Sequence, residues 1–169
     1  MFHKRFSWIA CLALLFIVAT TCFAMEEGKP APAFTATLLD GKTIDNNSLK
    51  GQVVILHFWA TWCEACRKEM PALDTYYRQH QSEGLRVIAI SMDDKKQDAA
   101  VQQVMQSYRF PAAHERDSNY KGFGRIWAMP MTFVIDRDGI LRKDGSAHPW
   151  IMNQSTLENI ISPLLAPKN

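Results

Sequence analysis

The chain has 169 residues, of which 47% are hydrophobic and 21% are charged, and its formal net charge is +2. This length suits one domain of ordinary size, and the composition excludes a disordered chain and a polytopic membrane protein. A core of this size does not need a disulfide to hold it together. The near-balanced charge gives no sign of a basic nucleic-acid-binding surface, so we expect no nucleic-acid partner.

The first 24 residues have the features of a secretory signal peptide. Two basic residues precede an apolar run over Trp8–Ala19, and the small residues Cys22 and Ala24 lie at positions −3 and −1 of a cleavage site. An uncleaved membrane anchor is the alternative, although the run is shorter than the roughly 20 apolar residues of a spanning helix. We therefore expect a periplasmic or otherwise exported protein, with membrane contact only if this leader stays attached.

Cleavage would change both the charge and the cysteine content. It would remove two of the 19 basic residues and none of the 17 acidic ones, so the mature charge would be balanced. It would also remove two of the four cysteines and leave Cys63 and Cys66. The domain plan is then a leader over 1–24, a polar and proline-rich lead-in over 25–33, and a single domain over 34–169.

The apolar patterns along the domain predict alternating strands and helices. Strands are expected as a hairpin over 34–44 around Asp40-Gly41, then over 53–59, 85–92, 131–136 and 140–145; helices are expected over about 63–81 and 93–108, and from 155 onward. The runs over 53–59 and 85–92 are continuously apolar, which is typical of strands buried on both faces. The economical arrangement is an α/β fold, a mixed sheet with helices on both faces.

Two helix starts have the spacing of a capping box. Thr61 and Glu64 have it at the first long helix, and Ser155 and Glu158 have it at the last. Pro71 lies inside the first helix, where we expect it to cause a kink.

The cysteines of "ATWCEACRKEMP", Cys63 and Cys66, are predicted to be a redox pair. A C-x-x-C near a βαβ pattern favours thioredoxin-like chemistry, because a helix N-terminus stabilises the thiolate that disulfide exchange requires. Cys66 lies on the same helical face and can resolve a mixed disulfide. A zinc site would need about four ligands, which the mature chain does not offer at suitable spacing. A purely structural disulfide over so short a loop would stabilise little.

The segment "FWATWCEACRKEMPAL" resembles the active site of the TlpA/ResA-like thiol-disulfide oxidoreductases, and "LKGQVVILHFW" and "MPMTFVIDRDG" extend the resemblance. It implies a thioredoxin-like three-layer fold with an added N-terminal β-hairpin. It also implies that Cys63 attacks and Cys66 resolves. Pro130 would be a cis-proline facing them, and the Met129 backbone would pair with the substrate chain. We expect no cofactor beyond the Cys63–Cys66 pair and no metal.

Several neighbouring residues carry alternative interpretations. His57 lies on the strand beneath the cysteines, where it is either a proton relay to Cys66 or a satisfied core histidine. Glu69 stands where ResA-like relatives carry a functional glutamate, so it is an acid/base candidate or a surface residue. Trp59 and Trp62 are expected to pack around the cysteines, and Trp62 is also a candidate substrate contact.

The charges around the pair favour a reductase. Glu64 and Glu69 would disfavour a thiolate nearby, which weakens the reduced form and makes the pair a better electron donor. The family resemblance adds a protein disulfide substrate such as apocytochrome c and a membrane-bound electron donor. Alternatives are a disulfide oxidase or isomerase on the same scaffold, and a copper-binding chaperone that uses the same cysteines. A peroxidase is disfavoured because neither cysteine lies in the P-x-x-x-T/S-x-x-C pattern of peroxiredoxins.

Overall fold

The computed structural model describes residues 25–147 and 150–166, so the expected leader over 1–24 lies outside the described residues. The strands are β1 (Thr35–Leu38), β2 (Thr43–Asp45), β3 (Val53–Trp59), β4 (Leu85–Ser91), β5 (Ala112–Asn119), β6 (Met131–Ile135) and β7 (Leu141–Lys143). The α-helices are α1 (Glu64–His80), α2 (Asp98–Met105) and α3 (Gln154–Leu165), and the 3-10 helices are η1 (Gln81–Glu83), η2 (Lys95–Gln97) and η3 (Lys121–Phe123).

The seven strands form one mixed sheet in the order β2-β1-β5-β4-β3-β6-β7. β3 pairs in parallel with β4, and β4 pairs in parallel with β5. β6 pairs antiparallel with the other side of β3, which places His57 opposite Thr132. The fully buried β3 lies at the centre, as its continuous apolar run predicts. Its carboxyl end leads directly into the segment that carries both cysteines.

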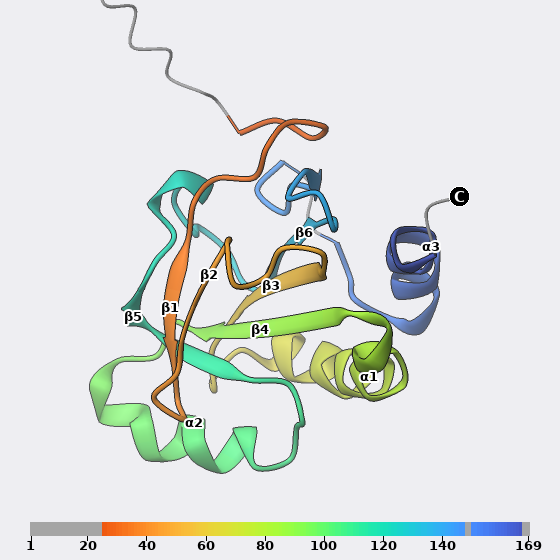
Figure 1. Ribbon diagram of the computed structural model, residues 1–169. Coiled ribbons are helices and arrows are strands. Elements are labelled where there is room, and N and C mark those ends of the chain that lie inside the picture. Colours follow the sequence, from red (N-terminus) through yellow and green to blue (C-terminus); the bar gives the residue numbers. More distant parts are fainter. Residues whose placement is uncertain (1–24, 148–149, 167–169) are drawn as a thin grey trace, which may run out of the picture.

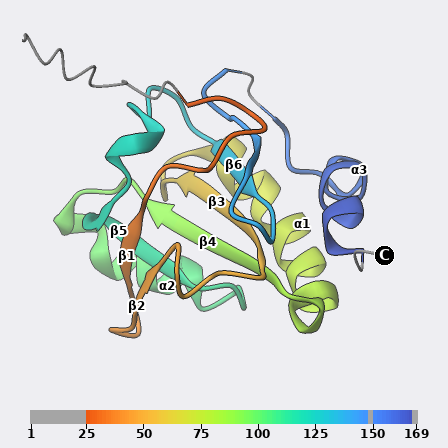
Figure 2. The same cartoon turned by 45° about the horizontal axis from the view of Figure 1, so that its top comes forward.

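The two faces of the sheet are covered differently. Side chains from α1, α2 and α3 pack in one cluster, which also contains Ile55, Trp59 and both cysteines. The alternate residues of β3 belong to a second cluster, which is covered by Phe34, Leu49 and the η3 residue Phe123. Figures 1 and 2 show α1 and α3 side by side. The thioredoxin-like mixed sheet is confirmed, and helices lie on both faces, but unequally. Among the described residues, three α-helices pack on one face, whereas the 3-10 helix η3 and loops cover the other.

The N-terminal hairpin β1–β2 is confirmed, and the lead-in before it is hydrogen-bonded to β7. Gly28 donates its N–H to the Leu141 carbonyl at 2.8 Å, and Leu141 donates to the Lys29 carbonyl at 2.9 Å. Pro30 forms an isolated antiparallel bridge with Ile140. The lead-in therefore covers the outer edge of β7, which would otherwise expose unpaired backbone groups.

Several element boundaries differ from the prediction. β5 was not predicted, because its sequence AAHERDSN has few of the residue types that favour strands. The second helix begins at Asp98 and not at residue 93, since η2 intervenes. Asn153 caps α3, accepting a hydrogen bond from the Thr156 N–H, so the predicted Ser155 capping box is wrong. α1 runs as one helix from Glu64 to His80, with Pro71 inside it.

Candidate active site

The cysteines lie where β3 ends and α1 begins. Cys63 donates its N–H to the Ala60 carbonyl at 3.1 Å, which closes a tight turn between the two elements. Cys63 is also the N-cap of α1, and its Sγ accepts a hydrogen bond from the Cys66 N–H at 3.2 Å. The predicted capping box of Thr61 and Glu64 is therefore wrong, because a sulfur atom occupies the capping position.

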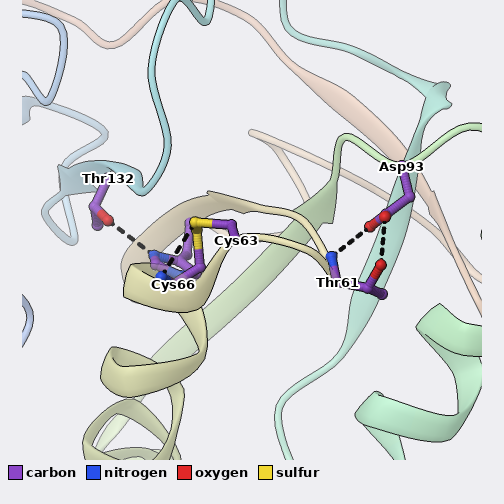
Figure 3. The surroundings of a disulfide bond; sticks show 6 residues. Thr61, Cys63, Cys66, Asp93 and Thr132 are labelled. Carbon is purple, nitrogen blue, oxygen red and sulfur yellow. Dashed lines mark hydrogen bonds between the residues drawn. A yellow bond between two sulfur atoms is a disulfide. The ribbon is translucent and has the colours of Figure 1, made fainter.

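Cys63 and Cys66 form a disulfide bond at this helix N-terminus (Figure 3). Cys66 is fully buried, whereas Cys63 retains 7% of its surface. A helix N-terminus favours a negative charge, because its free N–H groups and the helix dipole point toward it. Cys63 is therefore the less buried of the two cysteines, and the helix N-terminus favours its thiolate.

The loop before β6 contains a cis peptide bond between Met129 and Pro130, as the family resemblance implied. Both residues are half-buried, and Met129 packs against the cluster that contains both cysteines. Its role in pairing with a substrate backbone stays a prediction.

His57 is fully buried on β3 and faces the α1 side of the sheet, because its neighbours in the alternation, Ile55 and Trp59, belong to that cluster. Its Nδ1 lies 2.9 Å from Thr132 Oγ1, and its Nε2 has no hydrogen-bond partner. Burial lowers the pKa of His57 to about 4, so the ring is neutral near pH 7. Nδ1 thus has a hydrogen-bond partner, as expected for a core histidine, whereas Nε2 has none and could accept a proton, as a proton relay would need.

Glu69 lies one turn after Cys66 on the same helix and is 5% exposed. Residues three apart on a helix are neighbours on its surface, so Glu69 and Cys66 lie on the same side of α1. Burial raises the pKa of Glu69 to about 7, against the opposing effect of a hydrogen bond from the Met152 backbone. Its Oε2 has no hydrogen-bond partner. The alternative that Glu69 is a surface residue is wrong, and its acid/base role stays a prediction.

The two tryptophans of this segment have opposite environments. Trp59 is fully buried, as expected for packing, but Trp62 is 66% exposed. The expectation that Trp62 packs around the cysteines is therefore wrong, because it occupies the solvent side of the turn. Its exposure beside Cys63 suits the other prediction, that it contacts substrate.

Two further residues of the site were not predicted as members. Asp93 accepts hydrogen bonds from Thr61, and Thr132 bonds His57. Asp93 could have been found from the sequence, because it follows β4 as Thr61 follows β3, and the carboxyl ends of neighbouring parallel strands meet at one edge of the sheet. Thr132 carried no such signal, since its position depends on the register of β6 against β3.

Among the described residues, no group of three or more His, Cys, Asp or Glu side chains is arranged to hold a metal ion. Within the same residues, no helix is both long enough and apolar enough to cross a membrane.

Comparisons with known proteins agree with this geometry. A family model described as the AhpC/TSA family matches residues 28–144. A thiol-disulfide oxidoreductase ResA of Bacillus cereus is 36% identical over 137 residues, which cover 78% of this chain and 78% of that protein. The protein of the same name from Bacillus subtilis is 35% identical over 118 residues, which cover 69% of this chain and 65% of the relative.

A solved structure supports the same assignment. It is the crystal structure of a thiol:disulfide interchange protein of the thioredoxin family from Chlorobium tepidum TLS, which matches with a TM-score of 0.68 and 26% identity. The match covers 85% of this chain and all of that one. The chain therefore belongs to the AhpC/TSA family and, within it, to the ResA-like thiol-disulfide oxidoreductases.

Proposed function

We propose that the protein is a reductase of protein disulfides that works by cycling between the Cys63–Cys66 dithiol and disulfide. The observation that carries this proposal is the position of the disulfide at the start of α1, where Cys63 retains 7% of its surface and Cys66 is fully buried. The less buried thiolate begins the exchange, and the fully buried thiol close to it completes the exchange.

The reaction starts from the dithiol. The Cys63 thiolate attacks one sulfur of the client disulfide, so that the client S–S bond breaks and a Cys63–client disulfide forms. The departing client sulfur takes up a proton. Cys66 then loses its proton and attacks Cys63 Sγ, which releases the second client sulfur as a thiol. The client gains two electrons, and the protein is left with the Cys63–Cys66 disulfide, which a donor must reduce.

Among the two glutamates considered from the sequence, only Glu69 supports the reducing direction, and the N-terminus of α1 opposes it by favouring the Cys63 thiolate. Glu64 is exposed, and its carboxylate is paired with Lys68 at 2.8 Å, so it has little influence on the cysteines. Glu69 is buried one turn after Cys66, and its carboxylate would oppose a nearby thiolate. His57 is neutral near pH 7, so it does not supply the cationic histidine that stabilises the reduced form in strong oxidants.

The reduction potential of the Cys63–Cys66 couple tests the direction. Equilibration of residues 25–169 with a thiol redox buffer should give a value near the thioredoxin end, roughly −270 mV. A value near roughly −120 mV would identify an oxidant and overturn the proposal. Cys63→Ala should abolish dithiol-dependent reduction of a protein disulfide, with Arg67→Ala, an exposed change on the same helix, as a control for folding.

The cellular context is part of the proposal. We expect export with removal of residues 1–24, a membrane-bound electron donor and an envelope client such as apocytochrome c. Cys66→Ala should trap the client as a mixed disulfide with Cys63, and mass spectrometry of the trapped species identifies it. Recovery of no covalent partner would contradict the role of Cys66 as the resolving residue. N-terminal sequencing of the purified protein tests cleavage after Ala24.

A further inference from the structure

The turn that leads into Cys63 is tied to the neighbouring strand by one carboxyl group. Asp93 Oδ2 accepts a hydrogen bond from the Thr61 N–H at 2.9 Å, and Asp93 Oδ1 accepts one from the Thr61 hydroxyl at 2.6 Å. Ser91, the last residue of β4, donates its hydroxyl to Asp93 Oδ2 at 2.9 Å. Figure 3 shows the two bonds between Thr61 and Asp93 beside the disulfide.

Asp93 itself is firmly held. It is 6% exposed, and its own N–H donates to the Ser91 hydroxyl at 3.2 Å. The preceding residue, Met92, donates its N–H to the Trp59 carbonyl at 2.8 Å, which continues the contact between β3 and β4 past the ends of both strands. A buried carboxyl group with three hydrogen-bond donors is a satisfied polar group, so its position is well defined.

The two central residues of the turn differ in their surroundings. Thr61 and Trp62 are its two central residues, since the Cys63 N–H bonds back to the Ala60 carbonyl. Trp62 is 66% exposed, whereas Thr61 is half-buried and bonded to Asp93. Asp93 therefore holds one of the two central residues directly and, through the turn, the N-cap position of Cys63.

We propose that Asp93 is a positioning residue for thiol–disulfide exchange, which acts through Thr61 to hold Cys63 over the N-terminus of α1. In the dithiol form this restraint keeps the two sulfur atoms close together, so that less freedom is lost when the S–S bond forms. The restraint thus favours the disulfide form of the couple. The inference rests on exchange at Cys63 and Cys66 and is independent of whether the protein reduces or oxidises its client.

The test is the redox equilibrium constant of each variant against glutathione at pH 7. Asp93→Ala removes all three accepted hydrogen bonds, and we expect the equilibrium to shift about fivefold toward the dithiol, which corresponds to about 20 mV. Asp93→Asn removes the charge but can still accept from the Thr61 N–H and donate to its hydroxyl, so it should stay within twofold of the wild type. Asp94→Ala changes the next carboxyl residue, which is exposed, and serves as the control for loss of a nearby charge.

A more conservative substitution tests the proposal even if Asp93→Ala fails to fold. Thr61→Val removes only the hydroxyl contact and should shift the equilibrium two- to threefold in the same direction. A merely structural role for Asp93 would destabilise the oxidised and reduced proteins equally, so urea unfolding would change while the redox equilibrium stayed constant. That result would overturn the proposal. So would an Asp93→Asn variant that matches Asp93→Ala, because the charge and not the hydrogen bonds would then be responsible.

Discussion

Replacement of Glu69 by glutamine should change the pH dependence of stability by a predictable amount. Burial raises the pKa of this carboxyl group from an ordinary 4.5 to about 7. A tenfold difference in proton affinity is worth about 1.4 kcal/mol, so ionising Glu69 in the folded protein costs about 3 kcal/mol more than in the unfolded chain. Relaxation around the carboxylate reduces this figure, and about 2 kcal/mol is a reasonable expectation.

The sign follows from proton binding. Between about pH 4.5 and pH 7 the unfolded chain has released the Glu69 proton while the folded protein retains it, so the free energy of unfolding falls as pH rises through this range. Below the range the cost is absent, and above it the cost is complete. Glu69→Gln cannot ionise. Its free energy of unfolding relative to the wild type should therefore rise by about 2 kcal/mol between pH 4 and pH 8.

Urea denaturation of the oxidised proteins at a series of pH values measures this difference, with the disulfide kept constant. Any fixed cost of the glutamine amide is the same at every pH and cancels in the comparison. Glu64→Gln is the matched control, since Glu64 lies on the same helix but is exposed and paired with Lys68. A Glu69→Gln difference that stayed constant from pH 4 to pH 8 would refute the assignment of a raised pKa to this buried group.

Three other changes test neighbouring parts of the site. His57→Gln should remove a loss of stability that the wild type suffers between pH 6.5 and pH 4. The buried ring has a pKa of about 4, so the folded protein resists a protonation that the unfolded chain accepts. Urea denaturation at pH 4 and pH 7 should show that the free energy of unfolding of the variant, relative to the wild type, is up to about 3 kcal/mol higher at pH 4 than at pH 7. Trp62→Ala should raise KM for a protein disulfide about fivefold but leave reduction of a small aromatic disulfide unchanged, and equal effects on both substrates would exclude a client contact. Gly145→Ala should destabilise by about 1–3 kcal/mol in urea denaturation, because its Cβ would lie 2.7 Å from the Thr132 backbone nitrogen; unchanged stability would mean that this backbone yields easily.

Much of the fold follows from local patterns in the sequence. β3 and β4 are continuous apolar runs, which identify them as central strands before any pairing is known. β5 has no such pattern, and its outer half is largely exposed. It is a strand because β4 and β1 pair with it on either side, and this tertiary pairing overrides the low strand propensity of its residues.

The candidate site likewise contains residues that local patterns predict and residues whose roles depend on tertiary partners. The cysteines and the cis-proline lie in contiguous motifs, so their positions could be predicted from spacing and family resemblance. The local capping rule assigned Thr61 to the helix N-terminus, but in the structure its hydroxyl bonds Asp93, 32 positions along the chain. A tertiary partner thus replaced a local one, and Cys63 took over the cap. Such an exchange depends on strand register, which a local pattern does not contain.

The order of the two thiols in exchange follows from their different electrostatic surroundings. Cys63 lies at the N-cap of α1, where the helix favours its thiolate at any pH. Cys66 is fully buried, which disfavours its thiolate, and Glu69 one turn away adds a negative charge when it ionises near pH 7. Under the proposed mechanism Cys66 therefore stays protonated while Cys63 attacks. A carboxyl group with a pKa of about 7 is well matched to accept the Cys66 proton at the later, resolving step. In the proposed mechanism, attack by Cys63 before resolution by Cys66 thus depends on the helix N-terminus and on the deeper burial of Cys66, and not on the C-x-x-C spacing alone.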